Sequence, residues 1–257
     1  MKLSKATYIG FPHLFLDEVD STNAYALSLT SNSNPIEGTA ISAGFQSSGR
    51  GQIGRSWWGE PGKNIFTSVI LKPSHIQAAD QWIINQSVSI AIVKCLEAWV
   101  DKPIKIKWPN DIYINDKKIC GILIQCNLAG KNIQHAIIGI GLNVNQDQFP
   151  AELPNPTSLL EETDEEIDII QLRNALYASL EEHYGKTKTF DAVSIRHQYQ
   201  EYLYRKGLPT SFMKQGKSLI GTIMGVDEIG RLMLMINGRQ EAFNFNEVKM
   251  IINKKIF

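Results

Sequence analysis

The chain has 257 residues, which is enough for one large domain, or for one domain with a small appendage, around an ample core. Its 26 lysines and arginines balance 26 acidic residues, so the overall charge gives no support for a nucleic-acid or membrane-surface protein. The N-terminal region lacks the apolar core of a signal peptide, and no segment is apolar enough to span a bilayer. We therefore expect a cytoplasmic protein with no nucleic-acid or membrane partner.

Cysteines and histidines give no indication of a metal site. Cys95, Cys120 and Cys126 have no CxxC spacing, and the five histidines form no HExxH or other ligand pair. An odd number of thiols in a chain without a signal peptide fits a reducing compartment. The sequence therefore predicts no metal-binding residues.

Four polar residues follow the first predicted strand, which covers residues 13–19. Asp20, Ser21, Thr22 and Asn23 precede a run of helix formers, as N-cap residues do. Four such residues exceed the need of one cap. Two interpretations therefore stay open, a plain helix cap and a set of side chains that face a ligand.

A glycine-rich loop follows the predicted strand 39–46, which ends at Gln46. Its sequence, SSGRGQIGRSWW, brings two arginines, Arg50 and Arg55, to a backbone that three glycines open to close approach by a ligand. That combination suits phosphate or carboxylate. A mobile hairpin with solvated arginines is the alternative.

Two familiar classes of glycine loop are excluded by what surrounds this one. The spacing GRGQIG matches the dinucleotide fingerprint, but that site needs a helix directly after the glycines. Residues 64–71, NIFTSVIL, predict a strand instead. A kinase glycine loop also lies between strands, but the chain has no HRD or DFG sequence.

The middle of the chain predicts one long helix over residues 78–100, with an apolar stripe at spacings of three and four. A strand then runs from Ile104 to Trp108, and Pro109 ends its regular pairing. Asn110 and Asp111 follow at this break, where short polar side chains usually form turns.

A further strand, KKICGILIQ, follows the turn at Asn115 and Asp116, and its alternation places Lys118, Cys120 and Ile122 on one face. A lysine among apolar neighbours is either an edge residue whose ammonium reaches solvent or a buried charge that awaits an anion. The next strand, within residues 132–145, carries glycines that permit either a flat ligand or a bulge.

The C-terminal half changes character near residue 208. Thr163 and Glu166 have capping-box spacing, so the acidic run 161–168 is interpreted as a helix start and not as a metal site. Helices are expected over residues 167–186 and 190–206. Residues 211–250 predict short strands of a small β barrel. We place a domain boundary between residues 1–208 and 209–257.

Together these segments resemble the biotin protein ligase family. The motifs that carry the resemblance occur in the family's order: DSTN (20–23), GRGxxGR with its following tryptophan (49–57), KWPND (107–111), KxxGIL (118–123) and GxGxNVN (139–145). Each motif is modest alone, and the set is specific. The resemblance implies an α+β fold with a mixed, largely antiparallel sheet flanked by helices, related to class II aminoacyl-tRNA synthetases, and a C-terminal SH3-like β barrel. Since few residues precede the first strand, we expect a short form without an N-terminal DNA-binding domain.

The resemblance also implies a reaction. Biotin and ATP would form biotinyl-5′-adenylate and pyrophosphate, with Mg²⁺ assisting, and biotin would pass to a lysine of a biotin carboxyl carrier protein. Because a carboxylate and a triphosphate repel each other, the site must supply cations. The implied catalytic residues are Arg50, Lys118 and Asp111. The implied biotin-binding residues are Ser21, Thr22, Asn23, Gln46, Arg50, Gly51, Gln52, Lys118 and Gly121. The implied ATP-binding residues are Arg50, Arg55, Trp57, Lys107, Asn110 and Asn143, with Trp57 stacking on adenine and Asn143 reading the base.

One residue departs from the pattern of some family members, which carry arginine where this chain has Gln52. A neutral side chain there predicts weaker retention of the adenylate. Two other functions stay open: ligation or transfer of lipoate or octanoate on the same fold, and non-catalytic sensing of an adenylate. The motif set favours biotin over both. A homodimer is also implied as possible, and nothing in the sequence decides it.

Overall fold

A mixed seven-stranded sheet forms the larger part of the molecule. The computed structural model describes residues 5–52, 54–189 and 191–252. Its larger sheet has the strand order β1-β2-β3-β7-β6-β5-β4, with β1 parallel to β2 and the other neighbours antiparallel. The strands are β1 (His13–Val19), β2 (Ala40–Gln46), β3 (Asn64–Leu71), β4 (Ile104–Lys107), β5 (Asp111–Ile114), β6 (Lys117–Ala129) and β7 (Asn132–Asn143). The prediction of a mixed, largely antiparallel sheet is confirmed.

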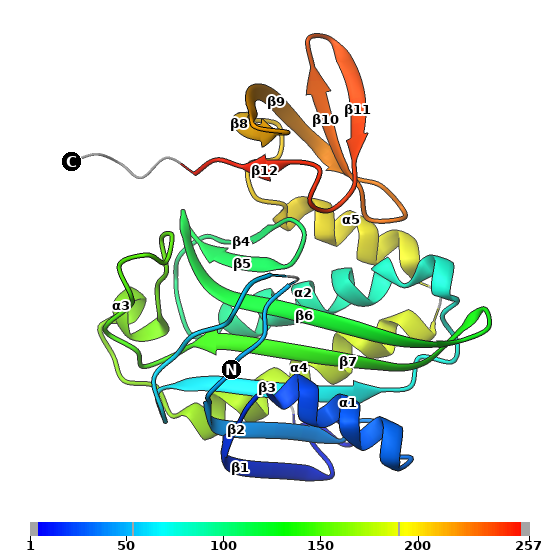
Figure 1. Cartoon of the computed structure of the whole chain (residues 1–257), viewed down its shortest axis with the longest axis vertical. Helices are drawn as coiled ribbons and strands as arrows, with labels where there is room; N and C mark the ends of the chain where they lie inside the picture. The colour runs from blue at the N-terminus through cyan, green and yellow to red at the C-terminus, as the bar shows by residue number, and fades with distance from the viewer. Residues whose placement is uncertain (1–4, 53, 190, 253–257) are drawn as a thin grey trace.

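Helices cover both faces of this sheet (Figure 1). The helix α1 lies on one face, over β2, β3 and β7, whereas α2 and α4 lie on the other. The helices are α1 (Thr22–Asn32), the 3₁₀ turn η1 (Ala78–Asp80), α2 (Trp82–Leu96), α3 (Leu159–Thr163), α4 (Ile169–Lys188) and α5 (Ala192–Tyr202). Coverage on both sides explains why every residue of β3 is buried, as its nearly continuous apolar sequence requires.

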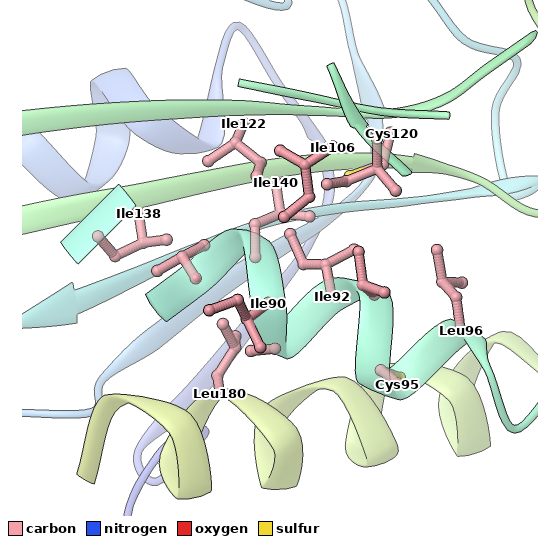
Figure 2. Packing of buried hydrophobic residues seen from close by; sticks show 14 of the residues in the cluster. Ile90, Ile92, Cys95, Leu96, Ile106, Cys120, Ile122, Ile138, Ile140 and Leu180 are labelled. Carbon is pink, nitrogen blue, oxygen red and sulfur yellow. The ribbon is translucent and has the colours of Figure 1, made fainter. Parts of the chain in front are cut away.

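The main core lies between α2 and the sheet. Figure 2 shows Ile90 and Ile92 of α2 packed among isoleucines of the strands, with Leu180 of α4 beneath. These side chains are at most 3% exposed, and α2 is buried on most of its sides because α4 and α5 pack against those that do not face the sheet. The main core therefore packs against this face of the sheet, and the candidate site lies on the opposite face.

Two predicted helix boundaries are wrong. The helix predicted over residues 78–100 is shorter, because the Ala78 N–H donates to the Lys131 carbonyl and the first turn is the separate 3₁₀ turn η1. The capping box predicted at Thr163 does not form. Thr163 ends α3, and the Asp168 carboxylate caps α4 by accepting from two first-turn N–H groups. The helix predicted over residues 190–206 is observed as α5, and Phe190 lies outside the described residues.

A second sheet follows α5 and packs against it (Figure 1). Its five antiparallel strands have the order β11-β10-β9-β8-β12. They are β8 (Pro209–Lys214), β9 (Lys217–Val226), β10 (Leu232–Ile236), β11 (Arg239–Phe243) and β12 (Lys249–Met250). The change to short strands near residue 208 is confirmed. Closure of this sheet into an SH3-like barrel stays a prediction.

Trp108, which follows β4, joins the two sheets. Its indole is 7% exposed, its Nε1–H donates to the carbonyl of Gly230 at 2.8 Å, and its ring centroid lies 6.3 Å from that of Phe245. Side chains of the smaller sheet also belong to the same continuous apolar core as α2. The segment that contains Asn110 and Asp111 is therefore anchored on the C-terminal sheet.

The N-terminal segment is tied to α4 by one carboxylate. Glu181 accepts hydrogen bonds from the backbone N–H groups of Thr7, Tyr8 and Ile9. Partial burial opposes ionisation, but these bonds and the Thr7 hydroxyl outweigh it and lower the pKa of Glu181. A lowered carboxyl pKa stabilises the fold above the unfolded-state value, and this stabilisation is lost as the pH falls through the folded-state value.

We expect Glu181→Gln to lower the free energy of unfolding at pH 7 by about 1 kcal/mol, after allowance for solvent screening of this partly exposed group. The difference from the unmodified protein should shrink as the pH is lowered through the acidic range. Urea unfolding at several pH values measures both effects. Glu182→Gln, at the neighbouring exposed position, is the control. An equal loss in both variants would contradict this role of Glu181.

Candidate functional site

A groove crosses the face of the sheet on which α1 lies. It is bordered by the start of α1, the end of β2, the glycine loop and the strands β5, β6 and β7. The predicted site residues that line it are Ser21, Thr22, Asn23, Gln46, Arg50, Gly51, Gln52, Arg55, Trp57, Asn110, Asp111, Lys118 and Gly121. The structure thus brings together segments that lie far apart in the sequence.

The start of α1 forms one end of the groove. Ser21 is the N-cap, and its Oγ accepts from the Ala24 N–H at 3.4 Å. The Oε1 atom of Gln46 accepts from the Thr22 N–H at 2.8 Å and from the Thr22 hydroxyl at 3.1 Å. The segment therefore caps the helix and also lines the groove, and its contact with a ligand stays a prediction.

Asn23 is held by the protein on all sides. Its Nδ2 donates to the Leu123 carbonyl at 3.3 Å and to the Oε1 of Gln125 at 3.1 Å, and its Oδ1 accepts from the Ser68 hydroxyl at 2.7 Å. The amide lies directly over Gly139, where a Cβ atom would come within 2.1 Å of Oδ1. Asn23 therefore fixes the corner of the groove, since its polar atoms already have partners. Its predicted contact with biotin stays a prediction.

The glycine loop folds back on itself. The Trp57 N–H donates to the Gly49 carbonyl at 2.8 Å, and the Gly51 N–H donates to the Arg55 carbonyl at 2.9 Å. A Cβ atom on Gly49 would lie 2.3 Å from the Trp57 carbonyl oxygen, so only glycine permits this approach. As predicted, the strand β3 and not a helix follows the loop.

Two glycines make a flat floor in the middle of the groove. Gly121 of β6 and Gly141 of β7 lie opposite each other in the sheet. The indole of Trp57 lies on both, because Cβ atoms there would come within 2.6 Å and 2.3 Å of the ring. The Nζ atom of Lys118 lies 5.2 Å from the centroid of the same ring. This floor holds a planar group, the indole itself.

Lys118 does not share a face with Cys120 and Ile122, so that prediction is wrong. Tyr113 pairs with Lys118 but Ile112 pairs with Cys120, which leaves one extra residue in β6 as a β-bulge. The bulge turns Lys118 to the groove, whereas Cys120 and Ile122 pack into the core that Figure 2 shows. Sequence alternation alone could not reveal this shift.

Positive charge surrounds a single carboxylate at this end of the groove. Lys118 Nζ lies 2.7 Å from Asp111 Oδ1, and Lys107 Nζ lies 3.9 Å from Asp111 Oδ2. Burial, together with the charges of Lys118, Arg55 and Lys249, lowers the pKa of Lys107, although Asp111 opposes the shift. The cations outnumber the carboxylate, so this region favours an additional anion.

Two predicted ATP-binding residues do not line the groove. Lys107 lies beside it and reaches it only through Asp111. Asn143 is 4% exposed, and its Nδ2 donates to the Thr157 carbonyl at 2.8 Å. Its Oδ1 is buried without a hydrogen-bond partner among the described residues. That orphan acceptor lies on the same face of β7 as Gly141, two residues away.

Sequence reasoning missed Ser68 and Gln125, which hold Asn23, and Ser56, which lines the groove. Ser68 is fully buried, as are the other polar residues of β3, Asn64 and Thr67. A buried hydroxyl needs a partner, so a serine within NIFTSVIL was the available indication for this contact. Gln125 carried no such indication, because its role follows from the pairing of β6 with β7.

Metal binding by the protein alone finds no support in the described part of the chain. No group of three histidine, cysteine or acidic side chains is close enough there to hold an ion. Asp111, the acidic residue among those that line the groove, is paired with two lysines.

Comparison with known proteins gives the family. Residues 15–143 match the model of the biotin/lipoate A/B protein ligase family. A bifunctional ligase/repressor of Bacillus spizizenii is 33% identical over 234 residues, which cover 90% of this chain and 71% of that protein. The chain belongs to the biotin/lipoate A/B protein ligase family. A member of this family from Paracoccus denitrificans, named biotin–[acetyl-CoA-carboxylase] ligase, is 28% identical over 85% of this chain and 92% of its own.

A solved structure agrees with this family assignment. The biotin protein ligase of Aquifex aeolicus in complex with biotin and ATP superposes with a TM-score of 0.79 at 25% identity, covering 94% of this chain and 99% of that one. The biotin/lipoate ligase fold predicted from the motifs is thereby confirmed. Among the helices that the structure describes, none has the length and apolar character needed to cross a membrane.

Proposed function

We propose that the protein activates biotin with ATP to biotinyl-5′-adenylate, releases pyrophosphate, and transfers biotin to a lysine of a biotin carboxyl carrier protein. One observation carries the proposal. A single groove joins a corner of hydrogen-bonding side chains, an indole that rests on two glycines and a group of cations. A cyclic urea with a carboxylate tail, followed by an adenylate, needs these features in one site.

The polar corner suits the ureido ring of biotin. The hydroxyl proton of Thr22 is directed to Gln46 Oε1, so Thr22 Oγ1 faces the groove as an acceptor for a ring N–H. Gln46 Nε2 and the hydroxyl of Ser21 remain as donors for the ring carbonyl. A dithiolane ring or an alkyl chain would leave these buried groups unpaired, which disfavours lipoate and octanoate.

The cations reduce the repulsion between the two anions that must react. The carboxylate of biotin must approach the α-phosphate of ATP, and negative charge grows there as the new bond forms. Arg50 and Lys118 both line the groove, and Arg55 and Lys107 add charge nearby. We assign Arg50 and Lys118 to the reacting carboxylate and α-phosphate. Gln52 adds no charge to this set, so the adenylate is retained less strongly than an arginine would retain it.

Mg²⁺ fits this site as part of the substrate MgATP. Mg²⁺ binds mainly through phosphate oxygens and water with one or two carboxylates, so it needs no protein cage. Asp111 is the carboxylate in position, and its two lysine partners would then be freed for phosphate oxygens. In the transfer step Asp111 also serves to hold the incoming carrier lysine.

Adenine is assigned to the Trp57 indole, on the side away from Gly121 and Gly141, and to Asn143. The indole of Trp57 already rests on Gly121 and Gly141, so it is placed to stack with a base. The unpartnered Oδ1 of Asn143 is an acceptor suited to the exocyclic amine of adenine. Residues 1–208 would thus hold both substrates, with residues 209–257 as a separate small domain that supports them. We further propose that the enzyme is cytoplasmic and acts as a monomer or a homodimer.

The experiment is pyrophosphate release on mixing the protein with MgATP and either biotin or lipoate, followed by mass spectrometry of a carrier domain. We expect release with biotin only, and a mass gain of one biotinyl group on the carrier. Release with lipoate only would assign the chain to lipoate ligation. Binding of biotinyl-adenylate without release or transfer would identify a sensor.

A further inference from the structure

Ser68 links Thr22 and Asn23, two of the side chains that form the polar corner of the groove. It lies on β3, is 0% exposed, and its Oγ is 2.8 Å from Thr22 Oγ1 and 2.7 Å from Asn23 Oδ1. A serine hydroxyl carries one proton, so this proton is shared between two acceptors. Ser68 itself is absent from the lining of the groove.

The remaining hydrogen bonds determine how each group of the corner is oriented. Both Nδ2 protons of Asn23 are directed away, to Leu123 and Gln125, so Oδ1 must point to Ser68. The hydroxyl of Thr22 donates to Gln46. A lone pair of Thr22 Oγ1 is therefore left toward the groove, and its rotamer is held by Ser68 from one side and Gln46 from the other.

We infer that Ser68 is the positioning residue that makes the groove selective for a ring N–H donor, as in a cyclic urea, by holding Thr22 Oγ1 as an acceptor. This inference rests on the proposed binding of biotin at this corner. Without the Ser68 hydroxyl, Asn23 Oδ1 would lose its donor while buried, and the amide of Asn23 would reorganise. Thr22 would then be free to rotate, and its oxygen would no longer face the ring N–H.

Ser68→Ala should raise the dissociation constant for biotin about tenfold, whereas the dissociation constant for ATP should change less than about twofold. The decisive readout compares biotin with its two analogues methylated on one or the other ring nitrogen. The unmodified protein should reject one isomer strongly. In Ser68→Ala the ratio between that isomer and biotin should shrink, because the acceptor is no longer held in place. Titration calorimetry measures all of these constants.

Thr67→Val is the matched control. Thr67 is the preceding residue of β3, is equally buried, and its hydroxyl bonds Tyr177 on the opposite face of the sheet. Its loss should lower thermal stability but leave biotin binding and the analogue ratio unchanged. If Ser68→Ala does not fold, Ser68→Cys, which keeps a weak donor of similar shape, should give smaller shifts of the same sign.

The outcomes separate this inference from the proposed function. If the unmodified protein binds biotin and releases pyrophosphate but Ser68→Ala keeps the full analogue ratio, the positioning role is wrong and the function stands. If the unmodified protein does not bind biotin, both fail. Equal weakening of biotin in Thr67→Val and Ser68→Ala would assign the effect to general loosening of β3 and would overturn the inference.

Discussion

Lys118→Ala should lower kcat for biotin-dependent pyrophosphate release on the order of a hundredfold or more. Lys118 lies 2.7 Å from Asp111 and beside the indole of Trp57, at the end of the groove where positive charge gathers. A cation that meets charge developed only during reaction contributes mainly to kcat. The dissociation constants for biotin and ATP should change much less than kcat does. Single-turnover formation of the adenylate measures the step directly.

Lys117→Ala provides the control for this substitution. Lys117 precedes Lys118 on β6, but its side chain is 52% exposed and turns to Glu161 and Glu162 at 3.9 Å and 3.6 Å. Its removal deletes the same charge from the same strand without changing the groove, so the adenylation rate should stay within about twofold. A Lys118→Ala enzyme that forms the adenylate at the normal rate would show that the assignment of Lys118 is wrong.

Gly139→Ala and Gly141→Ala should separate the role of the polar corner from that of the glycine floor. The new Cβ atom at position 139 would lie 2.1 Å from Asn23 Oδ1, and Asn23 cannot yield without breaking its hydrogen bonds to Ser68, Leu123 and Gln125. We expect biotin binding to weaken on the order of a hundredfold, from overpacking together with these lost bonds.

The methyl group at position 141 meets a different side chain. It would lie 2.3 Å from the ring of Trp57, so the indole must move off Gly121 and Gly141 to make room. The planar floor would then be lost, so KM for ATP should rise while biotin binding is largely kept. Steady-state kinetics with each substrate varied in turn measures both constants. The same loss of biotin affinity in both variants would contradict separate roles for the polar corner and the glycine floor.

Much of the fold could be predicted from the sequence, because its strands have clear β-branched runs bounded by turn residues. Residues 13–19 and 64–71 are strands with the predicted bounds, and each hairpin turn near the C-terminus lies where Gly and Asn predicted it. Helix ends were less predictable, since they depend on which residue finds a partner. Asp168 caps α4 with two hydrogen bonds, whereas the spacing of Thr163 and Glu166 had predicted a cap at Thr163.

The site was predictable as a set of motifs but not as a network. Asp111 and Lys118 were expected near the reacting groups, yet a β-bulge and not strand alternation turns Lys118 toward Asp111. Ser68 lies far in the sequence from Thr22 and Asn23, and nothing in NIFTSVIL says which residues its hydroxyl meets. Contacts of this kind depend on how distant segments pair in the fold, which local composition and spacing do not determine.

The anchoring of Trp108 has a consequence for the chemistry of the groove. Asn110 and Asp111 follow Trp108 after a single proline, and Trp108 contacts Gly230 and Phe245, which lie in turns that connect strands of the C-terminal sheet. We therefore expect a substitution that loosens that sheet to displace the carboxylate that faces Lys118. The small sheet would then affect adenylation from a distance, although none of its described residues lines the groove.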